Sequence, residues 1–292
     1  MRDIAESRRG RRFAARMALL RPRDWLKNGF VFAPLLFAGA FRDPRAVLEV
    51  AFAAALFCIA SSAVYVFNDL HDIEEDRAHP RKRHSRPLAS GVLAATDARW
   101  LLLVLYTILA LCALRFAHLA AVLAFYIALN VVHTRVLKRL PVIDVFVVAS
   151  GFVLRVYAGA VAIDVPVSSW MFVTTLSLAL YLAVVKRRQE LVGATPESRH
   201  VLRYYSVALL DRYALMAGTS ALVFYALFVM SVRPALVPTV PLVMFGLFRY
   251  GWLVDYHSAG ESPAETVLRD PPLLATIVIW AGMSSAILAG AG

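Results

Sequence analysis

Nine long apolar stretches constrain this chain more than any other feature of its sequence. A helix of about 17–25 apolar residues can cross a hydrocarbon core of roughly 30 Å. The stretches are 26–41, 46–67, 98–115, 117–134, 141–163, 168–186, 211–232, 235–256 and 271–291. The first is short and contains Pro34. Because apolar residues run continuously along them instead of alternating, they predict membrane-spanning helices and not barrel strands.

We therefore expect an all-α, polytopic membrane protein with about nine transmembrane helices. The composition agrees, since 60% of the 292 residues are hydrophobic and 17% are charged, with a mean hydropathy of +0.65. Cys58 and Cys112 both lie in apolar stretches without a partner at metal-binding spacing, which favours neither a disulfide framework nor a zinc site.

The net charge of +11 needs an explanation, because strongly basic chains often bind nucleic acid. If all nine stretches cross the membrane, 26 of the 31 Lys and Arg residues fall on one side. Arg42, Arg45, Arg115 and Arg233 fall on the other side, and Arg155 lies inside a stretch. The positive-inside rule then explains the charge without nucleic acid. It predicts a plasma (inner) membrane protein with a cytoplasmic N-terminus.

The expected organisation is a basic cytoplasmic arm over residues 1–25 and a single transmembrane catalytic domain over residues 26–292. The arm superficially resembles the start of a signal peptide, but charges interrupt the apolar run that follows, so we expect it to be retained. Long cytoplasmic loops are expected at 68–97, 186–210 and 249–270.

A cluster of acids spans Asn68-Asp69-Leu70-His71-Asp72-Ile73-Glu74-Glu75-Asp76, at the end of the second stretch. If the helix continues, Asp69, Asp72 and Asp76 share one face. Three stacked carboxylates repel unless a cation neutralises them. Hard oxygen ligands suit Mg²⁺, which takes one or two carboxylates and completes its shell with water and substrate phosphates. Asn68 can add a carbonyl oxygen.

A basic, proline-containing loop follows at residues 77–91. Cations beside carboxylates make sense if both bind one ligand, with the metal on a diphosphate and arginine on its remaining oxygens. Arg83 and Arg86 are the predicted phosphate-binding residues. The alternative is a solvated acidic helix end, paired with Arg77, Arg81, Lys82 and Arg83.

The pattern Asn68-Asp69-x-x-Asp72-x-x-x-Asp76 resembles the first aspartate-rich motif of the UbiA superfamily of intramembrane prenyltransferases. Nine helices with active loops after the second and sixth are similar to that family's plan, and the resemblance covers essentially the whole chain. It implies a UbiA-like bundle around a central cavity, with Mg²⁺ as cofactor and Asn68, Asp69, Asp72 and Asp76 as metal ligands.

The second family motif differs in this chain. Aromatic prenyltransferases of the family carry another aspartate-rich stretch after the sixth span. Here residues 181–191 contain Lys186, Arg187 and Arg188, with Glu190 as the remaining acid. One acidic and one basic motif would hold a single metal cluster and directly bound phosphate, which points to a smaller, more highly phosphorylated donor.

This difference resembles the decaprenyl-phosphate phosphoribosyltransferase branch of the superfamily. Further stretches that resemble it are 21–28, 155–160, 204–206 and 249–250. The branch implies Mg²⁺-dependent transfer of 5-phosphoribose from phosphoribosyl diphosphate (PRPP) to a polyprenyl (decaprenyl) phosphate. Diphosphate is released, and the product supplies lipid-linked arabinose for the arabinan of the cell wall.

The resemblance implies five catalytic residues, which are Asp69, Asp72, Asp76, Lys186 and Glu190. The aspartates would hold Mg²⁺ on the diphosphate, Lys186 and Arg187 would bind its oxygens or the 5-phosphate, and Glu190 would bind a ribose hydroxyl or orient Lys186. The expected substrate-binding residues are Arg23, Lys27, Asn28, Asn68, Arg83, Arg86, Arg155, Lys186, Arg187 and Tyr205.

Arg155 supports a functional site independently, because a guanidinium inside a span is costly and usually faces a polar cavity. With Lys27 it is expected to attract the acceptor phosphate, while an apolar groove between helices takes the isoprenoid tail. The alternative is a structural ion pair with Asp144 or Asp164.

Two other functions stay open. One is a UbiA-type prenyltransferase that moves an isoprenyl group from its diphosphate to an aromatic or other acceptor. The other is a transporter, which predicts charged or broken helices at the middle of the membrane. The expected partners are PRPP, polyprenyl phosphate, membrane lipid and, in a homo-oligomer such as a trimer, further copies of the chain. Nucleic acid is not an expected partner.

Overall fold

The structure, a computed structural model, describes residues 2–78, 82–193, 200–257 and 263–290. Every regular element in these ranges is a helix, which confirms the all-α prediction. The chain forms two compact units. Unit 1 contains residues 1–28 and 55–136, and unit 2 contains residues 29–54 and 137–292.

Within the described ranges, eight helical segments are long and apolar enough to cross a membrane. They match the second to ninth apolar stretches, so the protein is an integral, multi-pass membrane protein. The segments are α3 (Pro44–His71), α6 (Ala95–Ala113), α7 (Ala117–Arg135), α8 (Ile143–Ala162), α9 (Ser169–Val192), α10 (Val207–Val232), η5 (Pro234–Thr239) with α11 (Val240–His257), and α13 (Pro271–Gly290).

The first apolar stretch, 26–41, is not a long α-helix. It forms the end of the 3₁₀ helix η1 (Pro22–Phe32), then α2 (Ala33–Phe37) and the start of η2 (Ala40–Arg42). Pro34 lies in the first turn of α2, where its missing N–H is tolerated, and Gly39 has a φ of 76° that ends the segment. The expected nine spans are therefore eight long helices and one irregular helical segment.

This irregular segment packs closely on α8 within unit 2. A Cβ atom at Gly159 would lie 1.8 Å from the carbonyl oxygen of Val31. Only glycine leaves room for backbone to approach a helix so closely, so Gly159 is needed for α8 to hold the end of η1.

In unit 1, a small apolar core ties α1 (Arg2–Leu20) and the segment before α6 to the cytoplasmic end expected for α3. The helix α1 contributes Ala15 and Leu19, and α3 contributes Val66. The segment before α6 adds Leu88 and Leu93. This core fixes α1 and the basic loop beside the acidic motif, together with the short helices α4 (Ile73–Ala78) and α5 (Lys82–Ser85).

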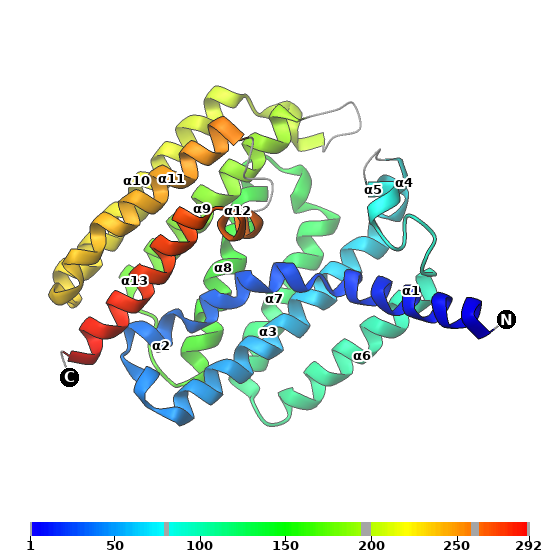
Figure 1. Ribbon diagram of the computed structural model, residues 1–292, viewed down its shortest axis with the longest axis horizontal. Coiled ribbons are helices and arrows are strands. Elements are labelled where there is room, and N and C mark those ends of the chain that lie inside the picture. The colour runs from blue at the N-terminus through cyan, green and yellow to red at the C-terminus, as the bar shows by residue number, and fades with distance from the viewer. Residues whose placement is uncertain (1, 79–81, 194–199, 258–262, 291–292) are drawn as a thin grey trace. The chain divides into compact units, whose positions relative to one another are not determined.

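In unit 2, α9 packs along α10 and also against α8, and α11 lies along α13 (Figure 1). One core cluster joins α8, α9, η4 (His200–Tyr204) and α10 through Val145, Val184, Val201 and Leu210. The remaining short elements of the unit are η3 (Leu137–Arg139) and α12 (Pro263–Arg269).

Several residues expected in loops are helical. The loop expected at 186–210 begins later, because α9 continues to Val192. Likewise α11 continues to His257, and residues 68–71 still belong to α3. The basic motif of residues 186–190 is therefore held on a helix, where its side chains have fixed directions.

Candidate active site

The acidic motif follows helical periodicity although α3 ends at His71. The Asp72 amide donates to the Asn68 carbonyl at 2.9 Å, and the Asp76 amide donates to the Asp72 carbonyl at 2.8 Å. The helix therefore bends at Asp72 without losing its register. Asp69 and Asp76 are buried and Asp72 is partly buried, whereas Glu74 and Glu75 are exposed. The three aspartates lie on the less exposed side, as their spacing predicts.

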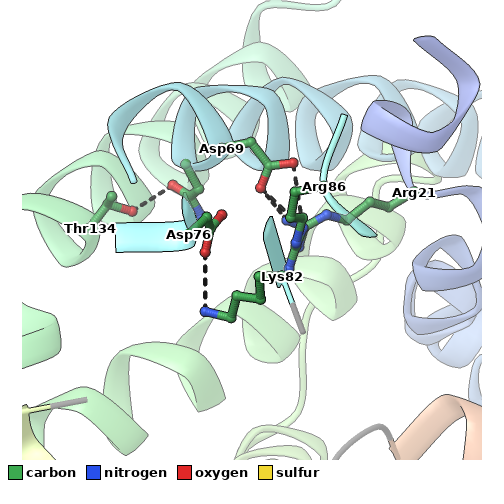
Figure 2. A network of polar contacts seen from close by, with 7 residues as sticks. Arg21, Asp69, Asp76, Lys82, Arg86 and Thr134 are labelled. Atoms are coloured by element: carbon green, nitrogen blue, oxygen red, sulfur yellow. Dashed lines mark hydrogen bonds and ion pairs between the residues drawn. The ribbon is translucent and has the colours of Figure 1, made fainter. Parts of the chain in front are cut away.

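Cations cover the two buried carboxylates (Figure 2). Arg21 Nη2 forms an ion pair with Asp69 Oδ1, and Arg86 Nη1 lies 3.0 Å from the same oxygen. Lys82 Nζ lies 3.2 Å from Asp76 Oδ1. Side-chain exposure is 5% for Asp69, against 22% for Arg21 and 28% for Arg86. The acids thus lie beneath a layer of more accessible cations.

The alternative, an acidic helix end paired with the neighbouring cations, holds for two pairs, one of which is Lys82 with Asp76. Arg77 Nη1 pairs with Glu74 Oε1 at 2.8 Å, and the Glu74 side chain is 83% exposed. Arg81 lies outside the described residues. The inner side, with Asp69 and Asp76, is buried.

Of the two predicted phosphate-binding arginines, the structure brings only Arg86 to the aspartates. Arg83 is exposed, and its Nε donates to His84 Nε2 at 2.9 Å. Asn68, the predicted neutral ligand, is positioned by α7, because Thr134 Oγ1 lies 2.6 Å from Asn68 Oδ1.

The segment from Leu20 to Asn28 is attached to α3 by small polar side chains. Ser62 Oγ donates to the Leu20 carbonyl at 2.9 Å and accepts from Trp25 Nε1 at 3.0 Å. Asn28 is buried, and its amide donates to Cys58 Sγ at 3.1 Å. These contacts fix η1 beside the acidic motif within unit 1.

Three predicted binding residues come from this segment. Arg23 is exposed. Lys27 Nζ pairs with Asp24 at 2.5 Å, and Asn28 faces α3. Arg21, which contacts Asp69, was absent from the predicted site. The sequence could have indicated Arg21, because it is the first residue of the stretch 21–28 and directly precedes Pro22.

The aspartates can hold a metal ion together with a phosphate ligand but do not form a closed cage. Among the residues that the structure describes, no three His, Cys, Asp or Glu side chains are grouped to hold a metal ion. A buried pair of carboxylates beside one amide oxygen nevertheless fits Mg²⁺, which uses few protein ligands and completes its shell with water and phosphate. The residues therefore fit a metal that arrives with its anion.

The basic motif lies in unit 2, in the last turns of α9. Arg187 is 4% exposed, its Nε lies 2.9 Å from Asp144 Oδ2, and it also pairs with Glu190. Arg188 pairs with Asp211 at 2.5 Å and with Asp255 at 3.1 Å. These ion pairs tie the end of α9 to α8, α10 and α11.

Asp144 is fully buried and joins the motif to Tyr205, the residue that follows η4. Tyr205 Oη donates to Asp144 Oδ1 at 2.7 Å and accepts from the Val142 amide at 2.6 Å. Burial, and then the hydrogen bond to Asp144, raises the pKa of Tyr205 to about 12, so the phenol stays protonated. Val142 has a φ of 67°, which is a strained conformation for a β-branched residue. Predicted as a substrate-binding residue, Tyr205 therefore holds this strained turn and orients Asp144.

Lys186 and Glu190 are partly exposed neighbours of this buried pair. Gln189, between them, is buried and donates to the Val254 carbonyl at 3.0 Å. Along residues 186–190, buried side chains (Arg187 and Gln189) therefore alternate with partly exposed ones.

Arg155 is buried in α8 of unit 2. Its Nη1 donates to the Gly151 carbonyl at 2.7 Å, and its Cζ lies 5.2 Å from the ring centre of Phe152. The alternative of an ion pair with Asp144 is wrong, because Asp144 binds Arg187 and Tyr205. The two residues are also about 16 Å apart along the helix axis.

Comparison with known proteins agrees with this picture. A sequence model of the UbiA prenyltransferase family matches residues 29–268. A decaprenyl-phosphate phosphoribosyltransferase of Mycolicibacterium smegmatis is 34% identical, over 92% of this chain and 91% of that protein. The protein of the same name from Corynebacterium glutamicum is also 34% identical, over 89% of this chain and 82% of that protein.

Solved structures share the fold. A UbiA homolog from Archaeoglobus fulgidus, solved bound to DMAPP and Mg²⁺, superposes with a TM-score of 0.70 at 18% identity. The match covers 94% of this chain and 99% of that one. A digeranylgeranylglyceryl phosphate synthase structure gives a TM-score of 0.63 at 16% identity, over 96% of this chain and 98% of that one.

Proposed function

The chain belongs to the UbiA prenyltransferase family, and from that premise we propose that it transfers 5-phosphoribose from PRPP to a polyprenyl phosphate, releasing diphosphate. It is a transferase embedded in the membrane. Relatives named decaprenyl-phosphate phosphoribosyltransferase support the donor and the acceptor. The observation that carries the donor is the composition of residues 186–190 in α9, which hold three cations and one acid. Arg187 and Arg188 are held in ion pairs, and Lys186 is the partly exposed cation beside them in the sequence.

The acidic motif would hold Mg²⁺ through Asp69, Asp72 and Asp76, with Asn68 as a neutral ligand. The bound ion would neutralise charge on the departing diphosphate, which makes it a better leaving group. Arg86, which pairs with Asp69, would bind the oxygens that remain.

The residues of the basic motif have two kinds of role in this proposal. Lys186 binds a phosphate oxygen of the donor, and Glu190 binds a ribose hydroxyl or orients Lys186. Arg187 is held by Asp144 and Glu190, so its contacts favour positioning of Glu190 over direct phosphate binding. Tyr205 supports the same pair through Asp144.

The chemistry needs little acid–base catalysis. As the bond to the diphosphate breaks, the sugar C1 develops oxocarbenium character, and the acceptor phosphate is already ionised at neutral pH. Positioning and electrostatic stabilisation therefore supply most of the rate enhancement. Lys27 and Arg155 are proposed to attract the acceptor phosphate, and Arg23, Asn28 and Arg83 to line the approach of the anionic substrates.

The proposed setting follows from the substrates. PRPP is soluble in water and a polyprenyl chain dissolves in lipid, so the enzyme would act at the cytoplasmic face of the plasma membrane. The positive-inside distribution of Lys and Arg supports that orientation. The product would supply lipid-linked arabinose for cell-wall arabinan.

A donor test on purified protein distinguishes the candidate reactions. We expect diphosphate to be released from PRPP only when both Mg²⁺ and a polyprenyl phosphate are present. Release from an isoprenyl diphosphate only with an aromatic acceptor would overturn the proposal in favour of a prenyltransferase. The matched control is the same chain with Asp72→Asn.

A further inference from the structure

Arg21 combines three unusual features at the turn between α1 and η1. It is not glycine, yet its φ is 51°, in the left-handed region. It precedes Pro22, which disfavours ordinary helical geometry at Arg21. Its guanidinium lies 4.6 Å above the ring centre of Tyr65 while pairing with Asp69. A strained backbone that persists is held by its surroundings, and here the Ser62 hydrogen bonds to Leu20 and Trp25 hold both sides of Arg21.

Two guanidiniums share one carboxylate at Asp69. Arg21 and Arg86 both approach Asp69 Oδ1, and Asp72 and Asp76 add further negative charge nearby. The cations therefore cover a carboxylate-rich site. The carboxylate is almost completely buried while both guanidiniums remain partly exposed, so an arriving anion meets the cations first.

We propose that Arg21 is a diphosphate-binding residue that, together with Arg86, occupies the Asp69 carboxylate until metal and diphosphate bind together. In this exchange Asp69 would become a metal ligand, and the guanidiniums of Arg21 and Arg86 would turn from the carboxylate to the diphosphate oxygens. Their planar forks suit two oxygens of a phosphate as well as they suit a carboxylate. No bond is made or broken in this step. The inference rests on the proposed function in one respect, which is that the donor carries a diphosphate group.

The exchange predicts opposite effects on two ligands. Arginine competes with metal for Asp69, so removing Arg21 should tighten the binding of metal alone. Arginine also binds the anion, so the same change should weaken the binding of diphosphate. A residue that only supported the fold would weaken both, and this difference makes the proposal testable.

The test variant is Arg21→Asn, because asparagine removes the charge and tolerates a left-handed backbone. The matched control is Arg16→Gln, which removes one positive charge from α1, where Arg16 pairs with Asp97 at 3.1 Å. The probes are Mn²⁺ alone, followed by electron paramagnetic resonance, and inorganic diphosphate at saturating Mn²⁺, followed by calorimetry. Thermal unfolding of each variant in detergent monitors the fold.

We expect Arg21→Asn to bind Mn²⁺ alone severalfold more tightly than the parent and to bind diphosphate about tenfold to a hundredfold more weakly. Arg16→Gln should change neither. Arg21→Lys, which keeps the charge and loses the fork, should give an intermediate loss for diphosphate. Weaker binding of both ligands, or no change in either, overturns the proposal.

Failure of the proposed function gives a different result. If PRPP is not the donor, Arg21→Asn still shows the opposite shifts with Mn²⁺ and inorganic diphosphate, while PRPP turnover is absent in the parent too. If the exchange is wrong, PRPP is turned over by the parent and the opposite shifts are missing.

Discussion

The acidic motif of unit 1 and the basic motif of unit 2 use ion pairs in opposite ways. Around Asp69 and Asp76 the carboxylates are buried and their cations, Arg21, Arg86 and Lys82, remain partly exposed. Around Asp144 both members of the pair are buried, since Arg187 is 4% exposed and Asp144 0%. The first arrangement can exchange its cations for a metal, whereas in the second the loss of either partner removes an ion pair in which both members are buried.

The burial of each ion pair therefore distinguishes charges that are available to bind a ligand from charges that stabilise the fold. A buried carboxylate under accessible cations can exchange those cations for a metal ion, because water and an incoming anion can solvate the cations while the metal keeps the carboxylate paired. A fully buried pair has no such replacement, and breaking it by removing one partner is strongly destabilising. We therefore expect ligand effects from unit 1 variants and stability effects from unit 2 variants.

The largest expected effect is on stability. Asp144→Asn should lower the free energy of unfolding by about 3–5 kcal/mol, because Arg187 loses its buried counterion. The measurement is chemical unfolding in detergent. The control is Asp211→Asn, in the same unit, whose side chain is 49% exposed and whose pair with Arg188 should contribute about 1 kcal/mol or less. Equal losses of unfolding free energy in the two variants would show that burial does not distinguish the Asp144 pair from an exposed pair.

The next effect is on catalysis. Asp72→Asn should reduce PRPP turnover by about a hundredfold to a thousandfold, since a ligand that stabilises transition-state charge is lost. Unfolding should be nearly unchanged, because Asp72 is only partly buried. Turnover as a function of Mg²⁺ concentration is the measurement, with Glu74→Gln on the exposed side as control. Full activity of Asp72→Asn would refute the metal assignment.

A smaller stability effect should follow from Tyr205→Phe, which removes the hydroxyl between Val142 and Asp144. We expect a loss of about 1–3 kcal/mol, because the buried Asp144 carboxylate and the part-buried Val142 amide lose their partner. The neighbouring change Tyr204→Phe, at an exposed residue, is the control.

Tyr205 also predicts a pH dependence. Its pKa is raised to about 12, above the ordinary value of about 10. Its contribution is therefore complete below about pH 10 and is lost as the pH rises through the folded-state pKa. Unfolding curves measured at alkaline pH should show this loss in the parent and not in Tyr205→Phe.

The smallest effect is expected at Lys82. Lys82→Gln should change the free energy of unfolding by about 1 kcal/mol or less, because the lysine is 42% exposed and screened by solvent. Raising the salt concentration should shrink the difference further. Arg77→Gln, on the exposed side of α4, serves as control. A loss as large as that of Asp144→Asn would mean that the unit 1 pairs are structural as well.

The sequence predicted well what depends on local periodicity. Apolar length predicted nine spans, eight of which are long helices in the described part of the chain, and the i, i+3, i+7 spacing predicted that Asp69, Asp72 and Asp76 share one face. It was less accurate at 26–41, where a proline, a close backbone approach at Gly159 and a left-handed glycine break the helix. Helix ends were also placed too early, since charged residues continue α9 to Val192.

The pairing of charges across the sequence was decided by tertiary structure alone. Arg21 reaches Asp69 across 48 residues because Ala15, Leu19 and Val66 pack α1 on α3. Arg187 finds Asp144 because α8 and α9 pack together in unit 2. The sequence by itself determined the membrane helices and the acidic face, because both repeat within a few turns of one helix. Which cation meets which acid depends on how helices pack, and no local spacing encodes that.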